Sequence, residues 1–333
     1  MWRPLKGSST PPPIAKIIGK AGGPSRKSEL HGFAVNNNGE RELPWGAGSM
    51  KPAQFDYVAP TTLRAAVEAL AATNGEGKVL AGGQSLLPLL NFRMVRPSVI
   101  IDLNGIKELS FIEMRGDRVV IGALTRHREI EQSAVIAAKL PVMSAAMRHV
   151  AHLAIRNRGT IGGSLSHADP AAELPMLAVF YDATIVAEGP SGQRRIEAEA
   201  FFVDALTNSL EQDEIVVEVE FPIPQQNGWA FEEVARRFGD FALASIAVSV
   251  RRGASNLEEA RVAAMGVSDT PRRLRTVEDQ LAGMQISNDL ADRFSELVVS
   301  VVSPNSDVHA SAEYRKQLLG ALAKRAMATV LAA

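Results

Sequence analysis

The chain contains no cysteine. It therefore has no disulfide framework, no cysteine nucleophile, and no iron–sulfur cluster or zinc ion held by cysteines of its own. Its 333 residues are enough to bury two or three hydrophobic units without covalent cross-links. Because the N-terminus also lacks a secretory hydrophobic segment, the sequence predicts a reducing, cytoplasmic environment.

An excess of one charge and long apolar runs are missing as well. The 36 basic and 37 acidic side chains leave a formal net charge of −1, which gives no electrostatic footprint for nucleic acid. No run of about 18 apolar residues occurs, so no membrane span is expected. The sequence thus predicts no nucleic-acid partner and no membrane span.

Residues 1–49 differ in composition from the rest of the chain. They hold clusters of turn-forming residues, such as 8–13 and 36–39, with almost no apolar periodicity between them. This composition predicts a disordered or weakly ordered leader, with a functional arm as the alternative. Met50 opens the well-patterned part and is a candidate biological start.

Residues 55–105 alternate between strand and helix patterns, which is typical of an α/β unit. The predicted strands are 55–59, 79–81 and 99–103. The predicted helices are 63–70, capped by Thr61 or Thr62, and 86–91.

Residues 106–222 mix a hairpin, helices and further strands. The predicted strands are 111–115 and 118–123, joined by Gly116-Asp117, and 183–187, 195–202 and 215–221. The predicted helices are 129–151, interrupted near Pro141, and 170–180, with Pro170 near its first turn.

Pro222, Pro224 and the turn-forming residues 225–228 make the strongest internal boundary. Strand patterns and then helix patterns follow, which predicts an α+β unit with a sheet covered by helices. The predicted strands are 229–236, 244–251 and 260–267, and the predicted helices are 272–282, 290–302 and 312–331.

The first of two glycine-rich segments holds Gly82-Gly83, between the strand at 79–81 and the helix at 86–91. Adjacent glycines let a ligand approach the backbone closely and align successive N–H groups, an arrangement that suits a phosphate. The segment has neither the Gly-Lys-Ser/Thr of a P-loop nor the GxGxxG fingerprint. Taken alone, an ordinary tight turn explains it equally well.

The second segment is predicted as a glycine-rich loop over 159–163, with Gly162-Gly163 and the hydroxyls of Thr160, Ser164 and Ser166. Two such segments, each leading into a helix, predict two walls of one elongated cofactor site.

Several charged residues near these segments have two interpretations each. Asp169 caps the following helix or lies near a ligand, and Glu173 is a surface acid or accepts hydrogen bonds from a bound ring or ribose. Arg156 and Arg158 neutralise phosphate or pair with acids at a subunit interface. The run Arg272, Arg273 and Arg275 is predicted to begin a helix as a solvated or partner-facing patch.

Four stretches of the sequence resemble one family. The segments 81–93 (AGGQSLLPLLNFR) and 157–175 (NRGTIGGSLSHADPAAELP) are similar to the FAD-binding medium subunit of the molybdenum hydroxylases. This family includes carbon monoxide dehydrogenase, bacterial N-heterocycle hydroxylases and the flavin domain of xanthine dehydrogenase. The segments 236–245 and 309–320 also resemble it. The resemblance covers about residues 50–330 and excludes the leader.

The resemblance implies an α+β fold. It implies a vanillyl-alcohol-oxidase-type (PCMH-type) FAD-binding domain over 50–222, made of two α/β subdomains at about 50–105 and 106–222. It implies a C-terminal domain over 223–333, with a three-stranded antiparallel sheet and a helical bundle.

The resemblance also implies which residues lie at FAD and which do not. The expected cofactor-binding residues are Ala81, Gly82, Gly83, Gln84, Ser85 and Leu86 at the pyrophosphate, Thr160, Ile161, Gly162, Gly163 and Ser164 at the second phosphate and ribitol, and Asp169, Glu173, Val216 and Phe241. Phe241 stands where some relatives have tyrosine, so a role that needs the hydroxyl is in doubt; a plain core aromatic is the alternative. No catalytic base, nucleophile or metal ligand is expected. Covalent flavin attachment to His127, His149, His152 or His167 is not expected either, and His149 with His152 lacks a third metal ligand.

The implied activity is that of an oxidoreductase subunit in a heterotrimeric molybdenum hydroxylase. A large subunit with molybdopterin cytosine dinucleotide would oxidise the substrate: carbon monoxide, an aldehyde, a purine or an N-heterocycle. A small subunit with two [2Fe–2S] clusters would pass the electrons to FAD, which would pass them to an external acceptor. The assembly implied is a dimer of heterotrimers. The alternatives are a stand-alone FAD-dependent oxidoreductase of the same superfamily and a scaffold that has lost FAD.

Overall fold

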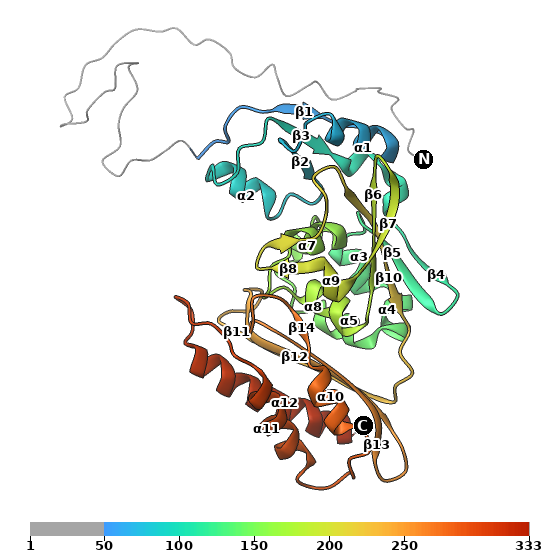
Figure 1. Ribbon diagram of the computed structural model, residues 1–333, viewed down its shortest axis with the longest axis vertical. Helices are drawn as coiled ribbons and strands as arrows, with labels where there is room; N and C mark the ends of the chain where they lie inside the picture. The colour runs from blue at the N-terminus through green and yellow to red at the C-terminus, as the bar shows by residue number, and fades with distance from the viewer. Residues whose placement is uncertain (1–49, 333) are drawn as a thin grey trace, which may run out of the picture. The chain divides into compact units, whose positions relative to one another are not determined.

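The computed structural model describes residues 50–332, and those from Lys51 onward belong to one compact unit. The predicted leader at 1–49 lies outside the described residues. Sheets of three, five and four strands, with their helices, follow one another along this unit (Figure 1). None of its described helices combines the length and apolar character that a membrane crossing requires.

The first sheet is parallel, in the order β1-β3-β2. Its elements are β1 (Asp56–Val58), α1 (Leu63–Ala71), β2 (Gly77–Leu80), α2 (Leu86–Asn91) and β3 (Val99–Asp102). Parallel neighbours need crossover connections, and α1 and α2 lie in the two connections. Thr62, one of the two predicted caps, accepts a hydrogen bond from the Ala65 N–H at 3.3 Å. The predicted strand–helix alternation in this part of the chain is confirmed.

The second sheet is antiparallel, in the order β4-β5-β10-β6-β7. Its strands are β4 (Ile112–Arg115), β5 (Arg118–Gly122), β6 (Thr184–Gly189), β7 (Gly192–Glu197) and β10 (Ile215–Pro222). The predicted strand at 195–202 is wrong in its second half, because β7 ends at Glu197 and α9 (Ala198–Phe201) follows. Ala198 and Phe201, three residues apart, both point into the core, which is the spacing of a helical turn. The pair β8 (Phe202–Asp204) and β9 (Thr207–Asn208) completes this part.

The predicted interruption of the helical stretch 129–151 near Pro141 is confirmed, but the stretch is divided further, into short helices. They are α3 (His127–Gln132), α4 (Ala134–Lys139), α5 (Pro141–Ala146) and α6 (Leu153–Arg156). The Ser133 hydroxyl accepts a hydrogen bond from the Ile136 N–H at 3.3 Å and so begins α4. Pro141 opens α5, where its missing N–H costs nothing. The apolar periodicity was helical throughout, but these two residues divide it.

The third sheet is antiparallel, in the order β11-β12-β13-β14. Its elements are β11 (Gly228–Ala235), β12 (Ala242–Arg252), β13 (Leu257–Met265), β14 (Arg272–Arg273), α10 (Arg275–Leu281), α11 (Leu290–Val301) and α12 (Ala312–Ala332). The three predicted strands are confirmed, and β14 adds a short fourth. The helix predicted from residue 272 begins only at Arg275, because Arg272 and Arg273 pair with β13.

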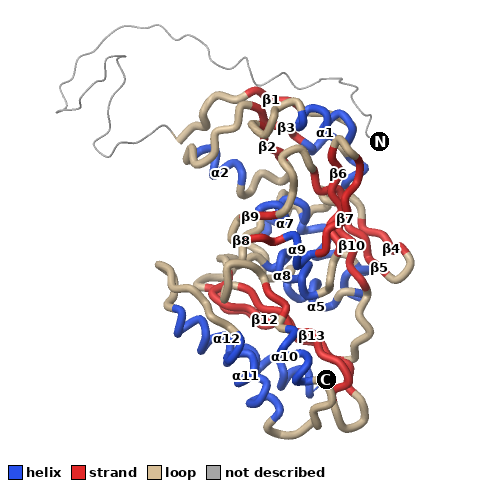
Figure 2. The backbone as a smooth tube through the Cα atoms, in the orientation of Figure 1, coloured by secondary structure: helices blue, strands red, loops and turns tan. Residues whose placement is uncertain are grey.

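Two different cores cover the two faces of this third sheet. Ala244, Ile246 and Val248 of β12 pack with the side chains of α10, α11 and α12, whereas Ala247 packs with those of α5 and α8. Successive residues of a strand point to opposite faces, so this alternation separates the two layers. In Figure 2 the three C-terminal helices lie together beside the sheet. The helix α8 (Glu173–Phe180) is buried at every residue, because it is apolar nearly all round.

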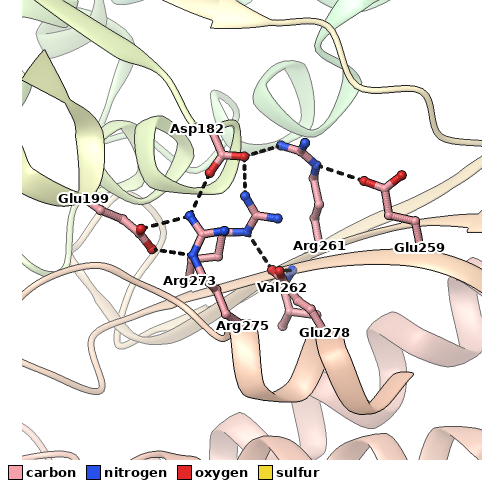
Figure 3. A network of polar contacts seen from close by, with 8 residues as sticks. All are labelled: Asp182, Glu199, Glu259, Arg261, Val262, Arg273, Arg275 and Glu278. Atoms are coloured by element: carbon pink, nitrogen blue, oxygen red, sulfur yellow. Dashed lines mark hydrogen bonds and ion pairs between the residues drawn. The ribbon is translucent and has the colours of Figure 1, made fainter. Parts of the chain in front are cut away.

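An ionic network also joins α8 to the third sheet (Figure 3). Asp182 accepts hydrogen bonds from Arg261 of β13 at 2.9 Å, from Arg275 of α10 at 3.1 Å, and from Arg273. Arg273 also donates to Glu278 at 2.8 Å, and its side chain is only 7% exposed. The predicted solvated or partner-facing arginine patch is corrected only for Arg273, which Asp182 holds in an internal contact, whereas Arg272 and Arg275 stay exposed.

Candidate cofactor-binding site

The first glycine segment offers a row of backbone donors. None of the N–H groups of residues 82–86 donates a hydrogen bond to a described residue. Gly83 has φ of +73°, a conformation that side chains disfavour. Two side chains stabilise the loop by hydrogen bonds to its carbonyl groups: Asn104 donates to Ala81 and Gln84 donates to Gly82, each at 2.9 Å. Five consecutive donors in a braced loop suit an anion such as a phosphate.

The second glycine segment is not the predicted loop. Residues Ile161–His167 form the helix α7, and the Thr160 hydroxyl caps it by accepting the Gly163 N–H at 3.2 Å. The N–H groups of Ile161, Gly162 and Ser164 donate to Thr125, Ala123 and Thr160 carbonyls at 3.2, 2.9 and 3.0 Å. These donors are already used inside the protein. What the segment leaves for a ligand is the bare surface of Gly163 and the half-buried Ser164 hydroxyl.

The glycines bring the two segments into contact. A Cβ atom on Gly82 would lie 2.4 Å from the Arg158 carbonyl oxygen, and one on Gly163 would lie 3.8 Å from the Ala81 Cβ. A Cβ on Gly162 would lie 2.6 Å from the Ala123 Cβ, so this glycine packs α7 against the end of β5. Two segments about 80 residues apart in the sequence therefore form adjacent walls.

Arg126 holds these walls together, and sequence reasoning missed it. Its guanidinium donates to the Asn104 side chain at 2.6 Å and to the Arg158 carbonyl. Burial, followed by the nearby charge of Arg158, lowers the pKa of Arg126. Nothing in the sequence pattern distinguishes Arg126 or Asn104 from other polar loop residues, because their role arises only when the loops meet.

Arg156 does not act as predicted. Its side chain is buried, and it donates to Glu131 at 3.0 Å and to the carbonyls of Val150 and Ala151 at 2.8 and 2.9 Å. A phosphate or a partner subunit would have to displace these internal bonds. Arg156 therefore braces the segment between α5 and α6, whereas Arg158 is exposed.

The two acidic residues near the end of the segment 157–175, Asp169 and Glu173, differ in role. Asp169 accepts the Ala171 N–H at 2.9 Å and so caps a turn; α8 begins later, at Glu173, and Pro170 lies outside it. Glu173 is 7% exposed, which excludes the interpretation as a surface acid. Burial raises the pKa of Glu173 to about 8, and the nearby Glu233 acts in the same direction. Glu173 therefore lies inside the fold, where its charged form is disfavoured.

Phe241 and Val216 occupy opposite environments. Val216 is 4% exposed in β10 and packs in the core of the second sheet. Phe241 is 59% exposed in the turn between β11 and β12, which excludes the interpretation as a core aromatic. The turn rests on the segment after α5, since a Cβ on Gly239 would lie 2.7 Å from His152 Cε1. An exposed large apolar ring is a candidate contact for a ligand or partner.

The histidines around the site are engaged in packing. His127 is 7% exposed beneath Gly159, and burial lowers its pKa to about 4, so it is neutral. His149 lies with Nδ1 3.6 Å from Glu233, and His152 packs on the turn at Gly239. Within residues 50–332, no three histidine or acidic side chains form a group suited to a metal ion.

Comparison with known proteins identifies the two parts of the chain. Residues 53–224 match the family described as the FAD binding domain in molybdopterin dehydrogenase, and residues 229–330 match the CO dehydrogenase flavoprotein C-terminal domain. Caffeine dehydrogenase subunit beta from Pseudomonas sp. (strain CBB1) is 40% identical over 281 residues, which are 84% of this chain and 95% of that protein.

Solved structures agree with this match. A chain of the carbon monoxide dehydrogenase from Hydrogenophaga pseudoflava superposes with a TM-score of 0.81 at 34% identity, covering 84% of this chain and 98% of that one. A chain of quinoline 2-oxidoreductase from Pseudomonas putida 86 also gives 0.81, at 35% identity, covering 85% and 98%. The chain therefore belongs to the FAD-binding medium subunits of the molybdenum hydroxylase family of dehydrogenases.

Proposed function

We propose that this chain carries FAD as the electron-transfer subunit of a heterotrimeric molybdenum hydroxylase. The observation that carries the proposal is the row of five unused backbone donors at residues 82–86. FAD, when bound, supplies the redox chemistry by taking up electrons and passing them on. The residues of this chain bind and orient it.

The chain offers a suitable surface for the pyrophosphate, the ribitol and the flavin ring of an extended FAD. The N–H groups of residues 82–86 would hold the pyrophosphate, with Ala81 behind them, and Gly163 permits close approach on the other wall. The Ser164 hydroxyl would contact the ribitol, and the exposed ring of Phe241 would cover one face of the flavin. The remaining proposed site residues, Thr160, Ile161, Gly162, Asp169, Glu173 and Val216, would support these contacts from behind.

The absence of cysteine from this chain indicates where the other redox cofactors of the complex would reside. The chain has no cysteine, so two [2Fe–2S] clusters would reside in a small partner subunit and the molybdopterin cofactor in a large one. Relatives named as medium chains or medium subunits support this assembly. We extend the proposal to a dimer of heterotrimers in the cytoplasm, with electrons leaving FAD for an external acceptor. The substrate would bind to the large subunit. We further propose a leader over 1–49 and domains over 50–222 and 223–333.

The first test is a visible spectrum of the full chain expressed alone, followed by acid release of any chromophore. We expect flavin absorption and free FAD in the supernatant, because the proposed contacts do not need a covalent bond. A colourless protein that also fails to bind added FAD would overturn the proposal for this chain. Co-expression with candidate large and small subunits would then test the partners: both should co-purify with this chain, one with molybdenum and one with iron.

A further inference from the structure

The turn that connects β11 to β12 and carries Phe241 is attached to a segment about 70 residues later, at the start of α12. At the first residue of the turn, Arg236 donates a hydrogen bond to Nδ1 of His309 at 2.9 Å. Just beyond its end, the Leu243 carbonyl accepts a hydrogen bond from Arg315 at 2.6 Å. One segment therefore contacts the chain on both sides of the turn.

Arg315 is the stronger of these two anchors, because its side chain is buried and makes further bonds. The side chain is 8% exposed, and it also donates to the Gly266 carbonyl at 2.9 Å and to Asp307 at 2.7 Å. Asp307 in turn accepts the N–H groups of His309 and Ala310 at 2.8 and 2.9 Å. The hydrogen bond from Arg315 lowers the pKa of Asp307 to about 2, so this carboxylate is charged at neutral pH. One buried cation thus joins two backbone carbonyls to a fixed carboxylate.

A β-bulge explains why Arg315 bonds to the backbone at this point. The register between β11 and β12 shifts at Leu243, which has no opposite residue in β11, and the pairing of β12 with β13 begins only at Ser245. A bulge of this kind interrupts the ladder of hydrogen bonds between strands. Gly266 directly follows β13 and brings its backbone close, since a Cβ on it would lie 2.9 Å from the Leu243 carbonyl oxygen. Arg315 therefore holds the place where the ladder ends and the turn of Phe241 begins.

The position of Arg315 in its own helix is unfavourable. The Ser311 hydroxyl accepts the Tyr314 N–H at 3.2 Å, and the Ser311 carbonyl accepts the Arg315 N–H at 3.0 Å, so α12 begins directly after Ser311. Arg315 thus lies in the first turn, where the helix dipole disfavours a cation. Its Nε donor also has no partner among the described residues. Helix stability does not account for Arg315, whereas its bonds to the start of β12 do.

These contacts give the exposed rings of the turn a fixed base. Phe238 is 70% exposed and Phe241 is 59% exposed, while Gly239, between them, packs on His152. A ring on a freely moving turn would have to lose that freedom when a ligand binds, which costs affinity. A turn that is already fixed avoids this cost, so the bonds of Arg315 bear on how well the turn can bind a ligand.

We propose that Arg315, with Asp307 as its partner, is a positioning residue for FAD: it fixes the start of β12 and thereby holds the ring of Phe241 ready to cover the flavin. Because Phe241 is the proposed cover, the inference rests on the proposed function and adds a residue to it. Arg315 acts through the turn, and its contribution to FAD affinity is the conformational freedom that the turn has already lost before binding.

Hydrogen exchange of the full chain without FAD tests the anchor itself. Arg315→Lys keeps the charge but loses the planar guanidinium, which reaches two carbonyls and a carboxylate at once. We expect the amides of residues 236–243 to exchange about tenfold faster in this variant, because the turn loses one or two of its hydrogen bonds. Asp307→Asn keeps the bonds to the carbonyls and should speed exchange in the same residues by a smaller factor. Unchanged exchange at 236–243 in both variants overturns the anchor.

The matched control is Arg273→Lys. Arg273 is buried to the same degree as Arg315, and its bonds go to Asp182 and Glu278 instead of the turn. It should destabilise the chain in urea denaturation, as Arg315→Lys does, but leave exchange at residues 236–243 unchanged. Urea denaturation also shows that each variant is folded.

Calorimetry with FAD and with ADP tests the link to the flavin. Both ligands carry the pyrophosphate, but only FAD has a ring for Phe241 to cover. In Arg315→Lys we expect the Kd for FAD to rise about tenfold, the upper end of the effect of one aromatic contact, and the Kd for ADP to stay within about twofold of wild type. Arg273→Lys should leave both Kd values unchanged.

The outcomes separate the two proposals. A wild-type chain that binds no FAD contradicts the proposed function, and hydrogen exchange then still decides whether Arg315 fixes the turn. Equal weakening of FAD and ADP binding in Arg315→Lys overturns the positioning role, because the loss would then be a general one. Faster exchange combined with an unchanged Kd for FAD overturns the link between the turn and the flavin.

Discussion

At the scale of single residues, the surroundings of a glycine, and not its backbone conformation, distinguish the proposed ligand loop from an ordinary turn. Gly83 and Gly116 both have positive φ, of +73° and +63°. Gly116 lies in the exposed hairpin between β4 and β5, where an added Cβ would meet nothing within 4 Å. Gly83 lies within the row of unused donors, where a Cβ would come within 3.0 Å of Leu87. The same strain therefore has different consequences at the two positions.

We predict that Gly83→Val loses FAD and that Gly116→Val retains it. Each substitution places a branched side chain at positive φ, which costs about 1–2 kcal/mol of folding free energy. Only the first distorts the donor loop. The measurement is the ratio of FAD to protein after purification, with urea unfolding to show that both variants are folded. Stoichiometric FAD in Gly83→Val would show that the loop does not hold the cofactor.

At the scale of an element, α7 depends on a cap, Thr160, that the family resemblance had placed at the cofactor. Thr160 accepts the Gly163 N–H, and its own carbonyl accepts the Ser164 N–H. The first turn holds two glycines, which are poor helix formers. A helix that begins in this way needs its cap to remain in place beside the first glycine segment.

We predict that Thr160→Ala lowers the free energy of unfolding by about 1 kcal/mol, because the first turn loses its side-chain acceptor. Thr160→Ser keeps the hydroxyl and should stay within a few tenths of a kcal/mol of the wild-type chain. Urea denaturation of the two variants side by side measures the difference. Equal loss in both would mean that the threonine methyl group, and not the cap, is what matters.

At the scale of the whole described unit, the third sheet is attached to the rest by a shared core and by the Asp182 network. The network draws on β13, β14 and α10, and it reaches α9 through Glu199 (Figure 3). The backbone adds a bond from the Gly266 N–H to the Pro170 carbonyl at 3.1 Å. These contacts place the turn of Phe241 relative to the glycine segments.

We predict that Asp182→Asn destabilises the chain by about 1–3 kcal/mol, because three arginines lose their shared acceptor. This loss of stability is smaller than the loss from breaking a fully buried ion pair, because the Asp182 side chain is 33% exposed. Asp292→Asn is the control. It breaks the exposed pair with Lys324 and should cost about 0–1 kcal/mol. Equal effects in urea denaturation would contradict a joining role for Asp182.

The same network should weaken in acid. Burial disfavours the charged form of Asp182, but the hydrogen bond from Arg273 and the charges of Arg261 and Arg275 outweigh it and lower the pKa. For a lowered pKa, the stabilisation is present above the unfolded value of 3.8 and is lost as the pH falls through the folded value. Unfolding of the wild-type chain and Asp182→Asn should therefore converge below about pH 4. A difference that persists there would show that charge is not the cause.

Most elements could be predicted from the sequence, and the errors have specific causes. The apolar spacing of α1, α11 and α12 and of the long strands β10, β12 and β13 is strong enough to predict them. In the helical stretch 129–151 the break near Pro141 was predicted correctly, but the break at Ser133 was missed, because a serine cap divides two helices without changing the apolar spacing. The prediction of one strand over 195–202 was wrong because the buried positions change from strand spacing to helical spacing at Ala198, where α9 begins. Both errors arise at single residues, and a periodic pattern read over about ten residues or more does not detect them.

The sequence by itself determined the family, the two glycine segments and the absence of cysteine ligands, because motifs and composition are properties of neighbouring residues. Only the tertiary structure decided that the second segment uses its donors internally and that the side chains of Arg273 and Glu173 are buried. Arg126, Asn104 and Asp182 acquire their roles in the same way. Each of these depends on partners far away in the chain, and burial sets the energy of a charge only once those partners are in place.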